Sequence, residues 1–540
     1  MNRMHITLFQ ADGADVYVCY PIGSRRETSA LQLNFTAPNY LVYGDKTRYT
    51  EEEAAQMVQQ YGLDRAAADG GGLVLVLCGS RADGWTAADA DAYHAVLRSM
   101  NPDTGAEYTF GVGKGRNFFT KEEELRIVGF PQTVHLVGIG KGADFVGTHM
   151  LRALQEERKG PDGKLSVTDR SPASVLLAEA SQVPRVDAGV IPGSEAYLLP
   201  LRVSAMNCPA GTAEALRPLG PGRWLTTEAD FGAEGLSPVL LSFNKRYLRQ
   251  AQQLLPVPDY ARLGIACRKE YRTVPTDPDN RNVSTPTHDI HYALFYPEEL
   301  DLQRDKVPLL LTFHGGGSTA LFMAIASQWP QIAREEGFMV AAVDRHTSCP
   351  AKEIMALIHA LKERYPCIDM TRLYANGYSM GGVKCWELIE QFPDVFAGIA
   401  PMHGSFAVGV ADIPAVPTPV YYVAGETTFL PEFPSQGENL QQRLDYVLKL
   451  NRVPMDYQPD YSVNPWWGIN GHRREQLPDP VTYPDSILTV EYFDSEDGRC
   501  MTAMAGGSNE GHEVYDRNCR AAWAFLKRFY RAADGSVMEL

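Results

Sequence analysis

The sequence predicts an α/β protein made of two tandem domains, each a mostly parallel sheet flanked by helices. Short, uninterrupted apolar runs at Leu73–Leu77, Val134–Ile139 and Leu309–Phe313 are typical of parallel strands that are buried on both faces. Glycine-containing turns and stretches with helical periodicity follow these runs. Strands that alternate with helices in this way indicate a layered α/β architecture.

Composition excludes several classes of function. The chain has 540 residues, of which 44% are hydrophobic, so it can bury large cores and divide into more than one domain. A formal charge of −16 and no basic run with interleaved aromatics argue against nucleic acid as a partner. Small or neutral substrates fit this charge better.

The expected compartment follows from the cysteines and the N-terminus. Nine cysteines stand singly, without a C-x-x-C pair, which favours reduced thiols over a disulfide scaffold. The first residues lack the apolar core of a signal peptide, and no window approaches 18 apolar residues. We therefore expect a cytoplasmic protein that does not interact with membranes.

The first half, residues 1–257, shows α/β patterning throughout. Periodicity predicts helices at Glu51–Tyr61 and Arg246–Leu255. Besides the two apolar runs, the predicted strands of this half are Asp15–Tyr20, Val175–Leu177 and Tyr197–Val203.

A comparison of the two halves suggests a repeat. Gly140 follows Leu73 by 67 positions, and Ser379 follows Leu309 by 70. On this alignment Gly140 stands where the second half has a serine, and no histidine occurs between His149 and His288. The turn at Gly140 matches neither a dinucleotide-binding nor a Walker motif. We interpret the first half as a catalytically degenerate copy, retained for packing, for shaping the site or for assembly into a homo-oligomer; the alternative is an unrelated α/β domain.

The second half is predicted to span residues 258–540. Pro256-Val257-Pro258 and a polar segment rich in Pro, Asn and Asp separate it from the first half. The later elements predicted here are strands at Leu309–Phe313, Phe338–Val343, Gly398–Pro401, Val420–Val423, Thr489–Phe493 and Cys500–Met504, and a final amphipathic helix with Ala522, Phe525, Leu526 and Phe529 on one face.

The second half contains a G-x-S-x-G motif, Gly377-Tyr378-Ser379-Met380-Gly381. A strand-like run precedes it and a helical segment follows, which is the context that this motif needs in order to act as a nucleophile elbow. Small residues two positions before and after the serine permit a sharp turn that exposes Oγ. The motif therefore predicts Ser379 as a nucleophile.

A glycine-rich segment supplies candidate oxyanion donors. The strand Leu309–Phe313 runs directly into His314-Gly315-Gly316-Gly317. Glycines at this position let backbone N–H groups turn toward a substrate carbonyl. We predict that the amides of Gly315 and Gly316, together with that of Met380, form the oxyanion hole.

A general base should follow the nucleophile along the chain. His512 lies after the last predicted strand and before the final helix, where a loop can carry it over the serine. The runner-up is His472, in a Pro- and Trp-rich segment without a preceding strand. His403 follows the strand after the elbow, and its role is left open. The remaining histidines considered, which we interpret as core or surface residues, are His5, His94, His135, His149 and His359.

The acid that orients the base is the least determined member. It should follow the strand Val420–Val423, but no aspartate occurs there, and Thr428 occupies its usual place. Glu426 is the first choice and Glu432 the second. Asp494 and Glu496 stay open as more distant alternatives.

At this point a resemblance becomes specific. The second half resembles the polyhydroxybutyrate depolymerase and feruloyl esterase group of α/β-hydrolases over roughly residues 290–530. The segments that carry the likeness are Val307–Gly404, with His314–Gly317, Tyr365–Arg372, Gly377–Gly382, Phe392–Gly398 and Pro401–Gly404 within it, and Gly511-His512 followed by Trp523–Leu526. The resemblance implies two tandem α/β-hydrolase-like domains and a serine esterase with Ser379 as nucleophile and His512 as base.

The function predicted from the sequence is carboxylic-ester hydrolysis through an acyl-enzyme, on small, aromatic feruloyl-like or hydroxyalkanoate-type esters. No metal or organic cofactor is expected, because no ligand cluster or Rossmann fingerprint occurs in the second half. Trp466, Trp467 and Phe429 are either pocket or core aromatics. The alternatives are a serine peptidase or acyl-peptide hydrolase with the same residues, and a non-catalytic binding protein.

Overall fold

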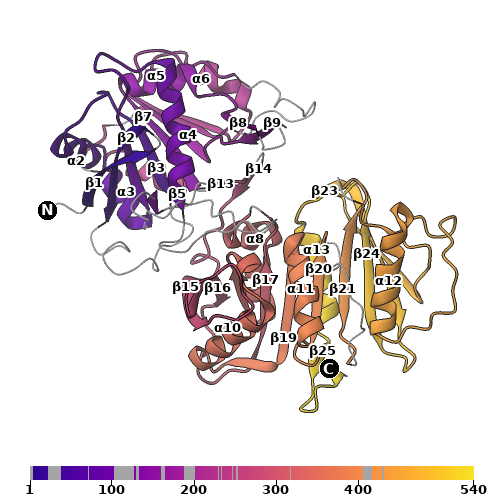
Figure 1. The fold of residues 1–540 in the computed structure, drawn as a ribbon. Helices are drawn as coiled ribbons and strands as arrows, with labels where there is room; N and C mark the ends of the chain where they lie inside the picture. The colour runs from indigo at the N-terminus through magenta and orange to yellow at the C-terminus, as the bar shows by residue number, and fades with distance from the viewer. Residues whose placement is uncertain are drawn as a thin grey trace. The chain divides into compact units, whose positions relative to one another are not determined.

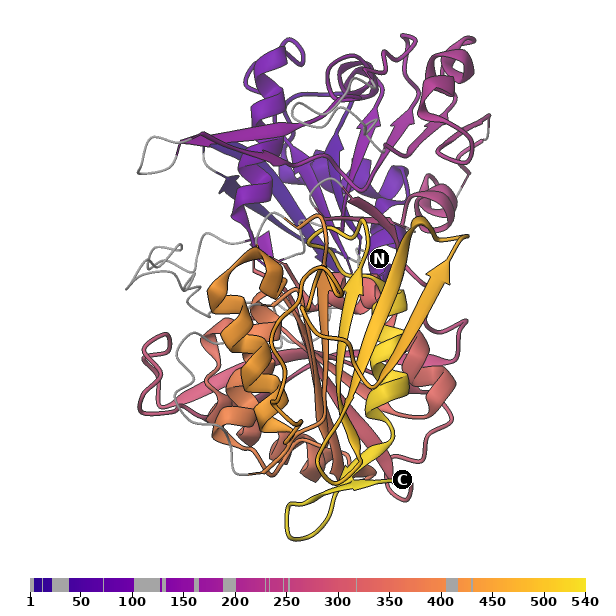
Figure 2. The ribbon, with the colours of Figure 1, turned by 90° about the vertical axis from the view of Figure 1, so that its right-hand side faces the viewer.

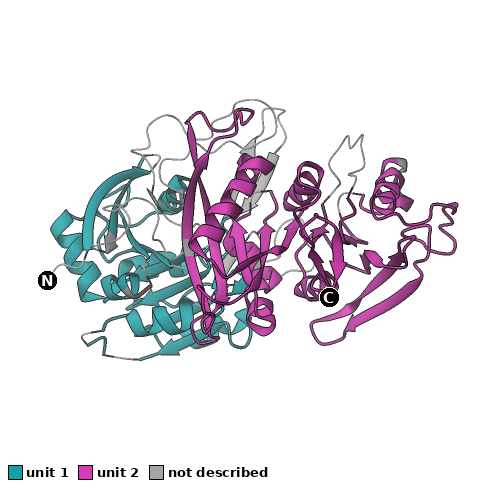
Figure 3. Cartoon of the chain, turned by 90° about the horizontal axis from the view of Figure 1, so that it is seen from below, with its two compact units in different colours: residues 1–106, 119–258 teal, residues 107–118, 259–540 magenta. Residues whose placement is uncertain are grey.

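The computed structural model divides into two compact units, which meet in the sequence at Pro258 and Asp259 (Figure 3). It describes residues 4–11, 13–21, 38–70, 72–101, 127–128, 133–159, 165–187, 201–228, 230–232, 234–245, 247–250, 253–316, 318–404, 416–428 and 431–540. The described residues up to Pro258 form unit 1, and those from Asp259 onward form unit 2. Both units are α/β, with parallel-rich sheets flanked by helices, which is consistent with an α/β-hydrolase fold.

Unit 1 is built on a sheet in the order β1-β2-β4-β3-β7-β10-β11-β12. The pairs β1–β2 and β2–β4 are antiparallel, and all later neighbours are parallel. The strands are β1 (Met4–Ala11), β2 (Ala14–Pro21), β3 (Asn39–Tyr43), β4 (Leu73–Leu77), β7 (Val134–Ile139), β10 (Ser174–Ala178), β11 (Val203–Met206) and β12 (Trp224–Thr227).

Helices cover both faces of this sheet. The alternating residues of β4 show the division, because Leu75 packs in one core with α4 and α5 while Val76 packs in the other with α2 and α3. The helices are α2 (Glu51–Gln60), α3 (Leu63–Gly70), α4 (Ala90–Ser99), α5 (Lys141–His149), α6 (Thr212–Leu216) and α7 (Ser237–Val239). Short strand pairs complete the unit: β5 (Met100–Asn101) with β6 (Ile127–Val128), β8 (Gln155–Lys159) with β9 (Leu165–Asp169), and β13 (Tyr247–Gln250) with β14 (Gln253–Pro256).

Unit 2 has the sheet order β15-β16-β18-β17-β19-β20-β21-β24-β23-β22. Its strands from β18 to β24 are parallel, and antiparallel strands extend both edges. The strands are β15 (Ile265–Pro275), β16 (Thr287–Pro297), β17 (Val307–Phe313), β18 (Met339–Val343), β19 (Ile368–Tyr378), β20 (Gly398–Met402), β21 (Val420–Gly425), β22 (Arg473–Asp479), β23 (Tyr483–Asp494) and β24 (Cys500–Gly507); β25 (Phe529–Arg531) pairs with β26 (Val537–Glu539).

Two groups of helices enclose the unit 2 sheet, as Figures 1 and 2 show. The first group is α10 (Ala351–Arg364), α11 (Met380–Gln391) and α12 (Glu438–Leu450), and the second is α8 (Ala320–Ser327), α9 (Trp329–Glu336) and α13 (Asp516–Leu526). Leu309, Leu311 and Phe313 of β17 belong to the core under the first group. On the second side Trp523 stacks on Phe338, with ring centroids 3.8 Å apart. The continuous apolar strands are thus buried from both sides, as the sequence predicted.

Three expectations about elements were wrong. Phe529, expected on the final helix, begins β25 instead, because α13 ends at Leu526. The segment predicted as a helix at Arg246–Leu255 contains the hairpin β13–β14 instead, because strand pairing overrides the helix propensity of its Gln and Leu residues. In the repeat alignment, β4 takes the sheet position of β18, and the counterpart of β17 is β3, which had not been predicted. The alignment was therefore displaced by one strand at its start.

Two further observations concern the chain as a whole. Among the described residues, no helix combines the length and the apolar composition that a membrane span requires. All nine cysteines are free thiols, as the sequence predicted.

Candidate active site

Ser379 lies in a sharp turn between β19 and α11. Its φ and ψ of 54° and −115° are unusual for a residue with a side chain. The turn needs glycine on either side, because a Cβ on Gly377 would overlap the carbonyl oxygen of Gly381, and a Cβ on Gly381 would overlap that of Phe313. This geometry is a nucleophile elbow, in which the serine hydroxyl stands at the end of the parallel sheet.

His512 contacts both the serine and a carboxylate. Its Nε2 lies 2.9 Å from Ser379 Oγ, and its Nδ1 lies 3.0 Å from Glu432 Oε1. These are hydrogen-bond distances, and they join residues that are 133 and 80 positions apart in the chain. Ser379, His512 and Glu432 therefore form one connected line, and their chain order is serine, glutamate, histidine.

The loop that carries His512 is fixed by its neighbours. The Tyr378 hydroxyl donates a hydrogen bond to the His512 carbonyl, and the Gly511 amide donates to Tyr515 Oη at 2.9 Å. Glu510 is fully buried, pairs with Arg517 and accepts from Asn518 Nδ2 at 2.8 Å. The base is thus held by α13 and by the elbow strand itself, which preorganises its ring.

Glu432 is the acid that meets His512, and it is almost completely buried. Its Oε2 accepts from the Gly425 amide at 2.9 Å and lies 3.0 Å from His403 Nδ1. Burial raises the pKa of Glu432, but the hydrogen bonds from His403 and His512 outweigh burial, so the pKa is lowered from its ordinary value. The carboxylate is therefore ionised at neutral pH, as an orienting acid should be.

The first choice for this acid, Glu426, is corrected by the geometry. Its carboxylate accepts from the backbone amide of Asn509 at 3.0 Å, while Glu432, the second choice, takes the place at the imidazole. The runner-up base, His472, instead accepts from the backbone amide of Asp494 at 3.1 Å. Glu432 is held by the loop after β21, where Gln436 Oε1 accepts from the Glu432 amide at 2.8 Å.

The predicted oxyanion donors lie against the elbow. A Cβ on Gly316 would come within 2.7 Å of Met380 Sδ, and a Cβ on Gly315 would come within 3.4 Å of the Ser379 Cβ. The same Cβ on Gly315 would come within 2.7 Å of the Tyr378 ring, so the loop after β17 packs closely against the elbow and favours glycine there. Gly317 lies outside the described residues.

Two histidines hold this loop. The Arg345 amide donates to His314 Nε2 at 3.3 Å, so the proton of His314 is on Nδ1, which donates to the Gly315 carbonyl at 2.7 Å. His346 Nε2 lies 2.7 Å from the His314 carbonyl oxygen. Burial lowers the pKa of His346 well below its ordinary value, so it is a neutral donor. Neither role was apparent from the sequence.

The candidate aromatic residues Trp466 and Trp467 pack against Phe433, the residue after Glu432. Trp467 is 2% exposed and belongs to the core of unit 2. Trp466 stacks on Phe433, the residue after Glu432, with centroids 5.0 Å apart. The two tryptophans therefore support the loop that carries Glu432, in agreement with the core alternative. Phe429 lies outside the described residues.

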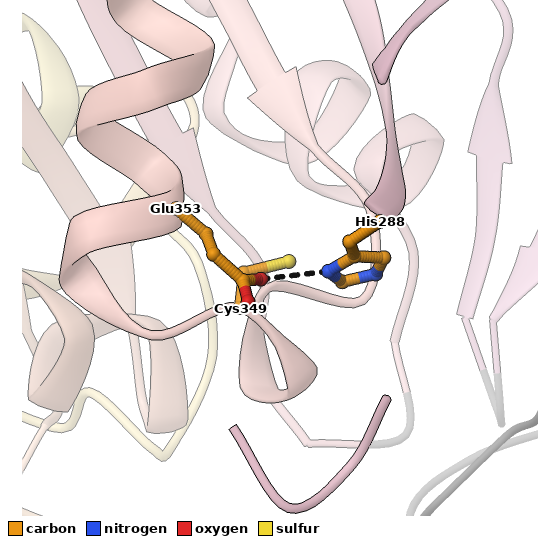
Figure 4. A group of neighbouring side chains, drawn as sticks. All are labelled: His288, Cys349 and Glu353. Atoms are coloured by element: carbon orange, nitrogen blue, oxygen red, sulfur yellow. Dashed lines mark hydrogen bonds and ion pairs between the residues drawn. The ribbon is translucent and has the colours of Figure 1, made fainter. Parts of the chain in front are cut away.

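Two groups of side chains in the described residues have donor atoms close enough to hold a metal ion. One is His403, Glu432 and His512, which belongs to the site above. The other, away from the line of the triad, is His288, Cys349 and Glu353, whose donor atoms lie within 4.8 Å of one another (Figure 4).

The second group is already satisfied by hydrogen bonds within the protein. Glu353 accepts from His288 Nδ1 at 2.7 Å, from the Asp277 amide at 2.8 Å and from Asn280 Nδ2 at 2.8 Å. Burial raises the pKa of Glu353, but these donors outweigh it and lower the pKa. The Glu353 carboxylate thus links the loop between β15 and β16 to α10 by hydrogen bonds. This structural role accounts for the proximity of the three side chains.

Comparisons with known proteins show what the chain is similar to. No model of a known protein family matches the chain. Over 127 residues, or 22% of this chain, it is 28% identical to a bifunctional acetylxylan esterase/xylanase of Neocallimastix patriciarum. The chain resembles esterases. The match spans only 19% of that relative's length.

Solved structures of esterases are also similar. An acetyl xylan esterase from Aspergillus awamori is 11% identical with a TM-score of 0.33, covering 48% of this chain and 98% of that one. A mutant feruloyl esterase module from Clostridium thermocellum, complexed with sinapinate, is 13% identical with a TM-score of 0.31, covering 48% and 88%. A thermostable esterase is 22% identical with a TM-score of 0.26, covering 34% of this chain and 52% of its own.

Proposed function

We propose that this chain is a serine carboxylic-ester hydrolase whose catalytic residues are Ser379, His512 and Glu432. The observation that carries the proposal is the unbroken line from Ser379 Oγ through the His512 ring to a buried, ionised carboxylate. A serine held in a strained turn and bonded to an imidazole has the geometry of an activated nucleophile. The similarity to esterases supports the same reaction class.

In the proposed reaction His512 Nε2 takes the Ser379 proton as Oγ attacks the ester carbonyl carbon. The amides of Met380 and Gly316 then stabilise the negative charge on the carbonyl oxygen. As the intermediate collapses, the leaving alkoxide takes the proton from His512 and departs as the alcohol. Water, deprotonated by His512, attacks the acyl-enzyme and releases the acid, which restores the serine.

We further propose that substrates are small acyl or feruloyl-type aromatic esters, with hydroxyalkanoate esters as a third class. The acetylxylan and feruloyl esters in the names of the similar proteins motivate the first two classes. A panel of p-nitrophenyl esters of increasing acyl length, methyl ferulate, acetylated xylan and a hydroxybutyrate ester would rank them. Turnover of aminoacyl-anilides in place of all esters would favour the peptidase alternative.

We also propose that unit 1 is a catalytically degenerate α/β-hydrolase-like domain in tandem with the catalytic one. The shared strand order of the two sheets and the glycine in the place of the nucleophile support this.

The test of the reaction class is covalent labelling. A fluorophosphonate probe should modify the wild-type chain at Ser379, and labelling should disappear in Ser379→Ala. An unlabelled wild type without ester turnover would contradict the proposal and favour a non-catalytic binding protein.

A further inference from the structure

A second histidine lies behind the proposed catalytic acid. His403 follows β20, and its side chain is 1% exposed. Its Nδ1 lies 3.0 Å from Glu432 Oε2, the oxygen that does not face His512. Glu432 therefore lies between two imidazoles, of which only one reaches the serine.

The two oxygens of Glu432 have separate partners. Oε2 also accepts from the Gly425 amide at 2.9 Å, which leaves Oε1 to His512. An ionised carboxylate can only accept, so His403 Nδ1 must carry the proton that it shares with Oε2. The Nε2 atom of His403 is buried, and within the described part of the chain it has no hydrogen-bond partner.

His403 is maintained at a cost. Its φ of 47° lies in the left-handed region, which a bulky side chain rarely adopts. Its buried Nε2 has no partner among the residues that the structure describes, which is also unfavourable. Strain of this kind concentrates at functional sites, where the surrounding structure enforces it. Both unfavourable features place the His403 ring where its Nδ1 can contact Glu432.

We propose that His403 is a positioning residue for ester hydrolysis: its Nδ1–H keeps Glu432 ionised and turned so that Oε1 faces His512. This inference rests on the proposed function. Besides Glu432, the groups that face the His403 ring are the rings of His512, Tyr378 and Tyr515, at 5.8, 6.1 and 6.2 Å.

Loss of this donor has a predictable direction. Burial raises the pKa of Glu432, and the hydrogen bond from His403 is the first of the contacts that lower it. Without that bond the pKa of Glu432 rises, so the carboxylate is protonated at a higher pH. The low-pH limb of the activity profile should then move to higher pH, and kcat should fall because Glu432 can turn away from His512.

The experiment compares variants that differ in the position of one donor. His403→Phe keeps a planar ring but removes the donor. His403→Asn places an amide N–H near the position of Nδ1 and tolerates the positive φ. His403→Gln extends the amide beyond that position. His472→Phe is the matched control, because that histidine bonds to the Asp494 backbone and not to the triad.

We expect His403→Phe to lower kcat for p-nitrophenyl acetate by about tenfold to hundredfold, and to move the low-pH limb to higher pH. KM should change little, since His403 does not reach the substrate. Asn should restore most of kcat and the original limb, and Gln should not. If the Phe variant does not fold, the Asn and Gln pair makes the same comparison.

Two outcomes would overturn the inference. The first is a kcat of the Asn variant no higher than that of the Gln variant, or a kcat of the Phe variant that falls while the low-pH limb of its activity profile stays in place. Either result would mean that His403 only fills space. A wild type that neither labels with fluorophosphonate nor turns over esters would refute the proposed function, and this role with it. An active, labelled wild type with an unchanged His403→Phe profile would refute the positioning role alone.

Discussion

The two units make the same turn at the same place in their sheets, but only one turn carries a side chain. Ser379 has φ and ψ of 54° and −115°, and Gly140 has 55° and −120°. Ser379 lies between β19, which pairs with β17, and α11. Gly140 lies between β7, which pairs with β3, and α5. A Cβ on Gly138 would come within 2.6 Å of Ala143 Cα, so this turn is also closely packed.

What differs is the group at the helix N-terminus. In unit 1 the Lys141 amide donates to Asp45 Oδ1 at 3.0 Å, and a Cβ on Gly140 would overlap that carboxylate. In unit 2 the corresponding amide belongs to Met380, and β17 is followed by His314 and then by glycines. In unit 1 a carboxylate of the protein thus occupies the helix N-terminus at which, under the proposed function, an oxyanion would bind in unit 2.

The largest effect should come from the serine itself. Ser379→Ala should lower kcat/KM for p-nitrophenyl acetate by about 10⁴-fold to 10⁶-fold, because the reaction loses its nucleophile. The reverse change in unit 1, Gly140→Ser, should add neither turnover nor fluorophosphonate labelling to a Ser379→Ala background. Labelling at position 140 would show that the two elbows differ less than we infer.

The acid gives the next largest effect. Glu432→Gln should lower kcat by about 10³-fold to 10⁴-fold, since an amide cannot stabilise the imidazolium of His512 as a carboxylate does. Glu426→Gln is the matched control, because it removes a carboxylate charge from the same loop while its amide oxygen can still accept from the Asn509 amide, and its kcat should stay within about threefold of the wild type. Equal losses in both variants would contradict the assignment of Glu432.

The sequence pointed to Ser379 and His512, which the structure brings into contact, because their signals are local or lie at a fixed place in the fold. Buried parallel strands read as continuous apolar runs, and the glycines around Ser379 are required by the turn itself. The chain order of the triad and the final helix pointed to His512.

The acid and its partners could not be predicted in the same way. Glu426 and Glu432 lie on one loop after β21, and their choice depends on how that loop folds back, which Gln436 and the stacking of Phe433 on Trp466 determine. His403 was left open because no local motif indicates its contact with Glu432. The strand β3 was missed because its residues, Asn-Tyr-Leu-Val-Tyr, do not form an uninterrupted aliphatic run like that of β4.

Unit 1 also contains a serine–histidine pair, and its environment separates it from the catalytic one. His135 Nδ1 lies 2.7 Å from Ser174 Oγ, and both residues are buried. Burial lowers the pKa of His135 from 6.5 to about 3, so it stays neutral in the folded protein. This pair lies in the core, where no substrate reaches it.

The pH dependence of stability tests this contrast. Above pH 6.5 the His135 ring is neutral in both the folded and the unfolded state, whereas between pH 6.5 and about 3 only the unfolded state binds the proton. Stability is therefore fully present above pH 6.5 and falls on acidification, by about 1.4 kcal/mol per pH unit or about 2 kcal/mol by pH 5. The free energy of unfolding of unit 1 can be measured by urea unfolding that is followed by hydrogen exchange of peptides from unit 1. It should depend less steeply on pH in His135→Gln than in the wild type. The same slope in both proteins would mean that His135 is protonated in the folded state.

The smallest expected effect concerns the carboxylate at the Gly140 turn of unit 1. Asp45 accepts from the first amide of α5, where a negative charge and a hydrogen-bond acceptor both stabilise a helix. Asp45→Ala should lower the free energy of unfolding of unit 1 by about 0.5–1 kcal/mol, and Asp45→Asn by less, because the amide oxygen still accepts. Ester turnover should be unchanged in both variants. If Asp45→Ala instead stabilised unit 1, the contact of the Asp45 carboxylate with the Lys141 amide would be unfavourable. The N-terminus of α5 would then be an anion site that Asp45 blocks. Phosphate titration of the Asp45→Ala variant would then detect binding at α5, whereas the contact that we infer predicts none.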